Sequence, residues 1–280
     1  MAIRLGTVAA IGFEQFPPAE WLGCFRELGC RVVQAYRNHK VNVSIEEMLD
    51  AIAAGGMPCD SLHGVYGEAH DPSSPDEGAR AAAVDTFKAE GELALRLGGP
   101  LVVVHCATIR EKGVSPAERG VRLEHLGKSV RELGTFGRKL GVQYAFENLP
   151  GYHAVGWDVA ELAATLRAAR APHTGMCFDT GHANMVGDAA VAAGQTAGQM
   201  IYVHLSDNSA LSDDHDMPTY GTLDCDALAR ALRAQNYLGT MMLEVFSSAD
   251  RLKRLVDDGC AEKLARIVAL AEGESSGAGP

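Results

Sequence analysis

The chain has 280 residues and a formal net charge of −11, from 25 Lys and Arg against 36 Asp and Glu. Hydrophobic residues make up 47% and charged residues 22%, which is typical of a globular protein with one or two domains and a large core. An acidic chain repels phosphate backbones on average, so nucleic acid is not the expected partner.

The seven cysteines are scattered and form no CxxC pair, so they indicate neither a disulfide framework nor a zinc knuckle. The first residues lack the apolar core of a signal peptide, and no apolar run approaches the length of a membrane span. We therefore expect a cytoplasmic protein that makes no membrane contact. The sequence leaves open whether the chain forms a homo-oligomer.

Strand-like and helix-like segments alternate through the first half of the chain. Ser44 and Glu47 form a capping-box pattern at the start of one helix, and Ser115-Pro116 is typical of the start of another. We predict strands over 3–9, 31–36, 58–65 and 101–105, and helices over 17–28, 44–54, 76–97 and 115–140.

The same alternation continues in the second half. A long polar loop over 206–222 predicts a lid or a binding loop, and the tail 273–280 has the composition of a disordered segment. We predict strands over 142–147, 174–178, 201–205 and 240–245, and helices over 158–169, 187–199, 226–235 and 249–271.

Eight strands that alternate with eight helices predict parallel strands joined by right-handed crossovers. Eight such units in residues 1–272 fit a closed (β/α)₈ TIM barrel better than a doubly wound sheet. No GxGxxG motif follows the first strand, which weighs against a dinucleotide-binding fold. We expect one barrel domain over 1–272.

Four predicted strands, the fifth to the eighth, end in side chains that can bind metal: Glu147, Asp179, His204 and Glu244. In a closed barrel these ends open on one face, so the four side chains should converge. Three carboxylates held this close would repel one another unless a cation neutralised them. The set suits one Mn²⁺, Co²⁺, Mg²⁺ or Zn²⁺ ion. Each residue taken alone is better explained as a helix cap or a solvent-exposed residue at a strand end, but all four together favour the metal site.

Four histidines are further candidates for the same face. His63 and His105 end the third and fourth strands, where they either line a substrate pocket or hold a second metal. His182 follows Asp179 by three residues, and we expect it to contact substrate. His215 lies in the long loop and either covers the site or is an ordinary surface residue.

Four short motifs resemble those of the xylose isomerase-like barrel superfamily, and within it the sugar phosphate isomerase/epimerase group. The motifs are Phe-Glu-Asn (146–148), Phe-Asp-Thr-Gly-His (178–182), Val-His-Leu-Ser-Asp (203–207) and Leu-Glu (243–244). The resemblance implies that Glu147, Asp179, His204 and Glu244 bind one catalytic divalent ion and that His182 contacts substrate oxygens. It also implies that the two glutamates shuttle protons.

These residues suit proton transfer next to a carbonyl group. A metal that chelates a carbonyl and the neighbouring hydroxyl acidifies the intervening C–H and stabilises the enediolate. Glu147 and Glu244 are then the catalytic acid and base. We predict a metal-dependent sugar isomerase or epimerase whose substrate is a small polyhydroxylated carbonyl compound. A lyase or dehydratase of keto-sugars or inososes begins with the same step and stays open.

Two departures weigh against 3-epimerisation of free ketoses. Ketose epimerases of the group usually carry an arginine soon after the histidine of the seventh strand, where this chain has Ser206–Ala210. They also tend to carry a second glutamate where this chain has His153.

The same superfamily includes zinc-dependent apurinic endonucleases. Asp213 and His215 lie further upstream of Gly221 than the Asp-x-His pair of that group should, and the charge of −11 disfavours binding to DNA. The metal ligands of that group would otherwise fall at His63, His105, Glu147, Asp179, His182, His204 and Glu244.

Overall fold

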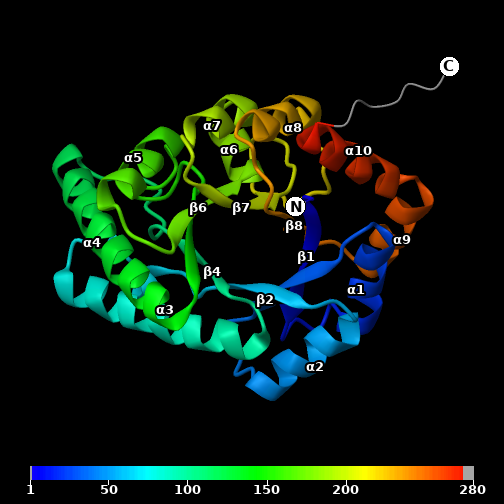
Figure 1. Ribbon diagram of the computed structural model, residues 1–280, viewed down its shortest axis with the longest axis horizontal. Coiled ribbons are helices and arrows are strands. Elements are labelled where there is room, and N and C mark those ends of the chain that lie inside the picture. Colours follow the sequence, from blue (N-terminus) through cyan, green and yellow to red (C-terminus); the bar gives the residue numbers. More distant parts are fainter. Residues whose placement is uncertain (1, 274–280) are drawn as a thin grey trace.

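The computed structural model describes residues 2–273, and its eight parallel strands close into a barrel in the order β1-β2-β3-β4-β5-β6-β7-β8. The predicted (β/α)₈ TIM barrel is confirmed. Figure 1 shows the helices as an outer ring around the strands. The strands are β1 (Arg4–Ile11), β2 (Val32–Arg37), β3 (Cys59–His63), β4 (Leu101–His105), β5 (Gln143–Glu147), β6 (Thr174–Asp179), β7 (Met200–Leu205) and β8 (Thr240–Leu243).

The outer ring contains ten α-helices and one short 3₁₀ helix within residues 2–273. They are α1 (Pro18–Glu27), α2 (Ile45–Gly55), η1 (Glu68–His70), α3 (Glu77–Leu97), α4 (Pro116–Leu140), α5 (Val159–Ala169), α6 (Thr180–Val186), α7 (Ala189–Gln195), α8 (Cys225–Ala234), α9 (Ala249–Asp257) and α10 (Cys260–Glu272). None of the helices in this part of the chain is both long and apolar enough to cross a membrane.

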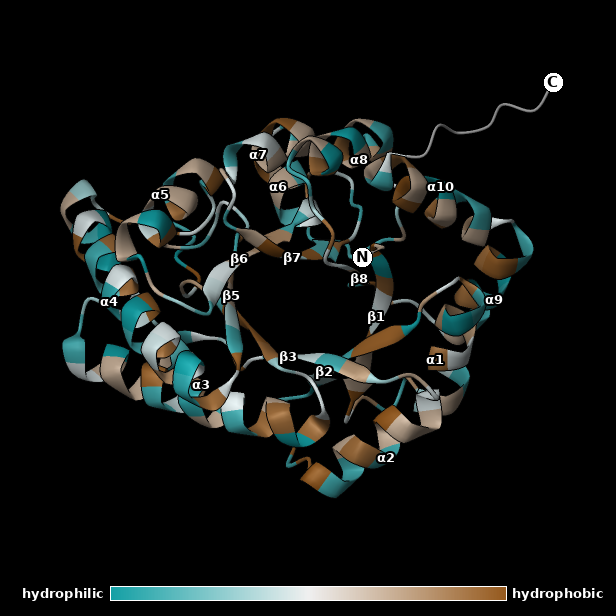
Figure 2. Ribbon diagram, in the orientation of Figure 1, coloured by the Kyte–Doolittle hydropathy of each residue, from teal (hydrophilic) through white to brown (hydrophobic). Residues whose placement is uncertain are grey.

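The helices bury one side against the barrel because their apolar residues recur at helical spacing. In Figure 2 the long helices carry both hydrophobic and hydrophilic residues. Trp21 and Phe25 of α1 are fully buried, and the Trp21 indole N–H donates to the Ser247 carbonyl oxygen at 2.8 Å. This contact joins the first helix to the segment after β8, so the two ends of the barrel wall are tied together.

The pairing register sets the height of each strand end at the barrel mouth. His105 of β4 pairs with Glu147 of β5, and Asp179 of β6 pairs with His204 of β7. Because paired residues lie at the same level, these side chains emerge side by side at the carboxyl face.

Two predicted helices differ from the observed ones. The helix predicted over 187–199 is shorter in the structure, where it is α7. A further helix, α6, precedes it and starts directly after β6. This helix starts there because the Asp179 carboxylate accepts a hydrogen bond from His182 N at 2.6 Å and so caps it. The helix predicted over 249–271 is two helices, since Gly259 at φ 73° ends α9 and starts α10. The disorder predicted over 273–280 falls, beyond Gly273, outside the described residues.

A buried ion pair joins the loop after η1 to α4. Arg122 Nη1 donates to Asp71 Oδ2 at 2.8 Å, and the two side chains are 1% and 3% exposed. Replacing Asp71 with Ala leaves the guanidinium with its bond to Glu118 at 2.8 Å and a long contact with Ser73 at 3.5 Å. We expect Asp71→Ala to lower the free energy of unfolding by about 3 kcal/mol in urea titrations.

Asp85→Ala is the matched control for this prediction, because Asp85 forms an exposed pair with Lys88 on the surface of α3 at 2.7 Å. Its loss should cost about 0–1 kcal/mol. Equal losses for Asp71→Ala and Asp85→Ala would contradict a structural role for the buried pair.

Candidate metal centre

The four side chains from the ends of β5 to β8 meet at the carboxyl face of the barrel. One ligand atom from each of Glu147, Asp179, His204 and Glu244 lies within 4.8 Å of the others. All four side chains are buried. Glu244 follows β8 instead of ending it as predicted, because that strand stops at Leu243.

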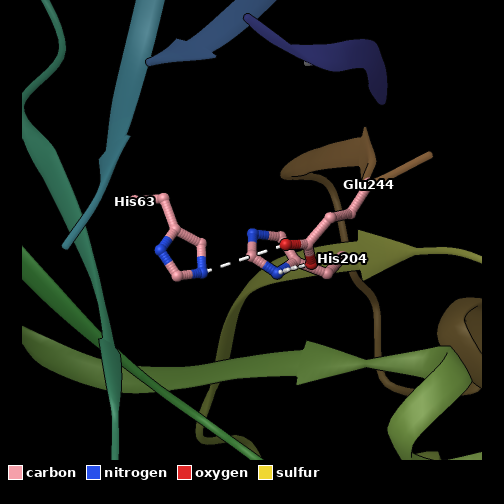
Figure 3. A group of neighbouring side chains, drawn as sticks. All are labelled: His63, His204 and Glu244. Carbon is pink, nitrogen blue, oxygen red and sulfur yellow. Dashed lines mark ion pairs between the residues drawn. The ribbon is translucent and has the colours of Figure 1, made fainter. Parts of the chain in front are cut away.

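The His204 ring nitrogen Nδ1 is the common neighbour of the three carboxylates. It lies 2.8 Å from Glu147 Oε1, 2.8 Å from Glu244 Oε2 and 3.8 Å from Asp179 Oδ2. Figure 3 shows His204 and Glu244 facing each other, with His63 directed at them from β3. A single ring N–H serves only one of these oxygens well, so the carboxylates retain unused acceptor capacity.

Several polar atoms at this point have no hydrogen-bond partner within the described residues. They are Glu147 Oε2, Asp179 Oδ2, Glu244 Oε2 and His204 Nε2, and each atom is shielded from solvent. Buried polar atoms normally have partners, so a cluster of such atoms is suited to bind a cation. Three carboxylates and one imidazole form a donor set that fits a divalent metal ion.

The pKa values of these groups show how the charges interact. Burial raises the pKa of the Asp179 carboxyl to about 7, and the negative charges of Glu147 and Glu244 act in the same direction. Burial also acts to raise the pKa of Glu244, but the positive charge of His204 outweighs it and brings that pKa to about 2. In the metal-free protein, Asp179 is therefore the carboxylate that holds a proton most readily.

Asn148 fixes the relative position of two of these strand ends. Its side-chain Nδ2 donates to the Asp179 carbonyl oxygen at 2.9 Å, and Asp179 N donates back to Asn148 Oδ1 at 2.8 Å. With Asp179 Oδ1 bonded to His182 N, the free oxygen Oδ2 is the one 3.8 Å from the His204 ring nitrogen. The donor set is thus held by backbone contacts that do not depend on a metal.

His63 and His105 lie beside the first four residues. His105 Nε2 is 3.1 Å from Glu147 Oε2, and His63 Nε2 is 3.8 Å from the same oxygen. Burial lowers the pKa of His63 to about 4, so its ring is neutral near pH 7. Ligand atoms of His63, His105 and Glu147 lie within 4.8 Å of one another, and both histidines line a cavity. The geometry accommodates both roles considered from the sequence, pocket wall and second metal site.

The long loop after β7 brings a residue that the sequence analysis did not include among the site residues. Asp213 Oδ2 lies 3.3 Å from His182 Nε2 and 3.2 Å from His215 Nε2. Burial acts to raise the pKa of Asp213, but the hydrogen bonds from His182 and His215 outweigh it and hold that pKa well below its usual range. Asp213 and His215 therefore reach the site although they lie further upstream of Gly221 than the Asp-x-His pair of the endonuclease group.

A buried carboxylate explains how this loop reaches the mouth. Asp207 accepts hydrogen bonds from the backbone N–H groups of Asn208, Thr219, Gly221 and Leu223 at 2.8–3.1 Å. Asp207 and Asp216 also exchange two backbone hydrogen bonds of 2.8 Å, which turns the loop back toward the barrel. In the sequence, only the Asp-x-His spacing of Asp213 and His215 indicated a role for Asp213. Its position at the site depends on this turn, which is formed by contacts between residues across the loop.

The candidate site opens into a cavity of about 210 Å³ at the same face. His182, His215, Asp213 and Glu244 form part of its wall. Aromatic residues that the sequence analysis did not single out complete it, namely Tyr36, Tyr66 and Tyr152.

Residues 22–264 match the family model described as the xylose isomerase-like TIM barrel. The chain belongs to this family. The resemblance first seen in four short motifs is thereby confirmed for most of the chain.

Two curated relatives of this xylose isomerase-like protein are uncharacterized. The chain is 28% identical over 159 residues to protein y4fM of Sinorhizobium fredii and 26% identical over 187 residues to protein MJ1311 of Methanocaldococcus jannaschii. The matches cover 56% and 65% of this chain, and 51% and 63% of the relatives. The chain therefore spans between half and two thirds of the length of each relative.

Solved structures with the same fold include three described as epimerases or epimerase-like. A D-tagatose 3-epimerase-like protein is 19% identical with a TM-score of 0.73, covering 95% of this chain and 100% of that one. The 3-keto-D-glucoside 4-epimerase YcjR of E. coli is 22% identical with a TM-score of 0.72, covering 95% and 98%. A D-psicose 3-epimerase is 16% identical with a TM-score of 0.75, covering 97% and 100%. At these identities the likeness shows the fold alone.

Mn²⁺ should raise the melting temperature of the metal-free protein, because a ligand bound only by the folded state stabilises it. The gain is about 2.7 kcal/mol at a free Mn²⁺ concentration of 100 times Kd. The pKa of Asp179 is about 7 in the metal-free protein, so its proton must leave before the carboxylate can bind metal. Below pH 7 the affinity should fall about tenfold per pH unit for each proton released. Differential scanning calorimetry between pH 5.5 and 8 measures both effects.

Asp179→Asn should remove most of this thermal shift. Asp188→Asn is its matched control, because Asp188 is an exposed N-cap of α7 and Asn caps a helix equally well. A full Mn²⁺ shift in Asp179→Asn would show that the metal binds elsewhere.

Proposed function

We propose that this protein is a divalent-metal-dependent isomerase or epimerase that acts on a small polyhydroxylated carbonyl compound. One observation carries the proposal. Glu147 and Glu244 each place a carboxylate oxygen 2.8 Å from the His204 ring nitrogen, and Glu244 also lines the cavity above. Two carboxylates this close together, one of them in the wall of a small cavity, suit removal and return of a proton.

Glu147, Asp179, His204 and Glu244 would together hold the metal. When bound there, a divalent cation polarises a carbonyl and a neighbouring hydroxyl of the substrate and so acidifies the C–H between them. Asp179 and His204 are the two ligands with no further task in the proposal. Their positions are fixed by Asn148 and by the strand pairing.

Glu147 and Glu244 would transfer the protons. Burial acts to raise the pKa of Glu147, but the charges of His204 and His105 outweigh it and hold that pKa well below its usual range. Both glutamates are therefore ionised near pH 7, and either can take the proton from the substrate carbon. The glutamate that took this proton would return it to the adjacent carbon in an isomerase. In an epimerase the other glutamate would first accept a proton from solvent and then donate it to the opposite face of the carbon.

His63, His105, His182 and His215 would orient the substrate. Each of these rings lines the cavity, and His63 is neutral near pH 7, so its ring nitrogen can contact a hydroxyl group. Asp213 and His215 come from the long loop and would cover the mouth, which limits access of water during proton transfer.

The epimerase structures that share the fold support this class of reaction, although their substrates are not carried over to this chain. The substrate itself stays undefined within the class. A lyase or dehydratase of keto-sugars or inososes would use the same first proton transfer, and product analysis separates it from an isomerase.

A multi-metal phosphodiesterase acting on abasic DNA is the second candidate function. It is favoured by the number of ligand groups, because His63, His105 and Glu147 form one additional cluster and Asp213 joins His182 to His215 in another. The net charge of −11 favours the isomerase, as does the absence of Lys and Arg from the cavity wall among residues 2–273. Elemental analysis discriminates, since one ion per chain supports the isomerase and two or three zinc ions support the phosphodiesterase.

Glu147→Gln and Glu244→Gln should each slow the exchange of substrate C–H with solvent deuterium by about 10²–10⁴-fold, because a positioned base is lost. NMR over a panel of ketoses and keto-inositols measures this exchange, with an abasic duplex assayed alongside for cleavage. Glu124→Gln is the control, since Glu124 lies on the outer side of α4 with its side chain 69% exposed. Exchange at the wild-type rate in Glu147→Gln would exclude Glu147 as a base.

A further inference from the structure

The two ring nitrogens of His204 have different surroundings. Nδ1 lies 2.8 Å from both Glu147 Oε1 and Glu244 Oε2, whereas Nε2 is buried and has no hydrogen-bond partner among residues 2–273. In Figure 3 a dashed line joins a ring nitrogen of His204 to Glu244. An ion held by the carboxylates would therefore bind the ring at Nδ1. A neutral imidazole carries one proton, so that proton then lies on Nε2.

The N–H group formed in this way needs an acceptor. A metal-binding histidine normally donates its second N–H to a neighbouring group, which fixes the ring and makes the ligating nitrogen more basic. The aromatic rings around His204 do not supply this acceptor. The His63 ring stacks on it at a centroid distance of 5.8 Å, and the Tyr202 ring meets it edge-on at 5.9 Å. The Tyr202 hydroxyl is already bonded to Ser61 and Asp60 at 2.6 and 2.9 Å.

Cys177 lies beneath the donor set on the neighbouring strand. Asp179 of β6 pairs with His204 of β7, and Cys177 pairs with Tyr202, so Cys177 lies two residues deeper in the barrel than Asp179. Its Sγ is within 4.8 Å of a ring nitrogen of His204 and of a carboxylate oxygen of Glu147. The thiol is free and fully buried, and it does not line the cavity. Its position therefore suits contact with the ring of His204 from below.

Gln34 Oε1 is another buried acceptor that has no partner in the described part of the chain. Gln34 lies on β2, three strands away from β7 in the closed barrel, and its side-chain amide donates to Ser61 at 3.2 Å. Cys177 lies on β6, which pairs directly with β7. Of the two acceptors, the sulfur is thus the one on a strand adjacent to His204.

We propose that Cys177 is a positioning residue of the metal centre, and that its sulfur accepts a hydrogen bond from His204 Nε2–H when a divalent ion is bound at Nδ1. This inference rests on the metal site of the proposed function and adds to it a residue outside the cavity. A thiol can accept this bond without bringing a fourth carboxylate charge next to Glu147, Asp179 and Glu244.

Two substitutions of Cys177 separate the role of acceptor from a role in packing. Cys177→Val keeps an apolar side chain in the barrel but removes the acceptor, whereas Cys177→Ser keeps an acceptor. In isothermal titration of the metal-free protein with Mn²⁺, we expect Cys177→Val to bind about 10–100-fold more weakly than the wild type. Cys177→Ser should lose less. A packing role predicts the reverse order, because Val suits an apolar interior and Ser does not.

Cys260→Val is the matched control, since Cys260 is also fully buried but lies on α10, outside the barrel strands. It should bind Mn²⁺ as tightly as the wild type. Gln34→Met removes the other acceptor and should also leave the affinity unchanged. Weaker binding in Gln34→Met together with wild-type binding in Cys177→Val would assign the contact to Gln34 and overturn the proposal.

NMR of the Mg²⁺-loaded protein with ¹⁵N-labelled histidine reports the position of the proton directly. We expect long-range ¹H–¹⁵N correlations to show the His204 proton on Nε2, and the signal of this proton to move to lower frequency in Cys177→Val as the hydrogen bond is lost. A proton on Nδ1, or an unchanged signal in Cys177→Val, would contradict the proposed bond.

Co²⁺ distinguishes a hydrogen-bonding thiol from a metal ligand. A thiolate bound to Co²⁺ gives an intense charge-transfer absorption in the near ultraviolet, which oxygen and nitrogen ligands do not give. We expect no such band in the Co²⁺-loaded protein. A band that disappears in Cys177→Ser would show that the sulfur binds the metal itself, and would overturn the proposal.

The Mn²⁺ titration also separates this inference from the proposed function. If the wild type binds Mn²⁺ and Cys177→Val binds it equally tightly, only the role of Cys177 fails. If the wild type binds no Mn²⁺, the proposed metal site fails and the role of Cys177 fails with it.

Discussion

Mutual repulsion among three buried carboxylates is the constraint on which the site depends. Glu147, Asp179 and Glu244 each approach His204, and burial removes the water that would otherwise screen them. Burial, reinforced by the charges of Glu147 and Glu244, raises the pKa of Asp179 to about 7. The fold holds these groups together only because closed strands and Asn148 fix their positions before any ion binds.

A buried carboxylate also occurs in the loop that covers the site, where it is stabilised in a different way. Asp207 is fully buried, and its carboxylate is stabilised by hydrogen bonds from four backbone N–H groups. The approach is so close that a Cβ added to Gly221 would lie 2.3 Å from Asp207 Oδ1, so only glycine fits there. One carboxylate thereby carries Asp213 and His215 to the mouth, where they complete the wall of the cavity.

The four residues at the centre suit both the proposed isomerase and the alternative phosphodiesterase, so the groups around them must distinguish the two reactions. The wall of this cavity combines His182 and His215 with the exposed side chains of Tyr66, Ile109 and Tyr152. Because most of these residues lie on loops and the donor set lies at strand ends, each can change while the barrel stays the same.

The sequence by itself determined the barrel and the four residues that form its centre. Alternating strand and helix patterns predict parallel strands, and a closed barrel places every strand end on one face, so Glu147 and His204 had to lie near each other. Helix boundaries were harder to predict from the sequence. The cap at Asp179 and the break at Gly259 each depend on a single residue within a longer helical pattern. Only the tertiary structure decided that Asp213 reaches His182 and which side chains line the cavity. Both depend on how loops distant in sequence fold over the mouth, and no local pattern of residues encodes that path.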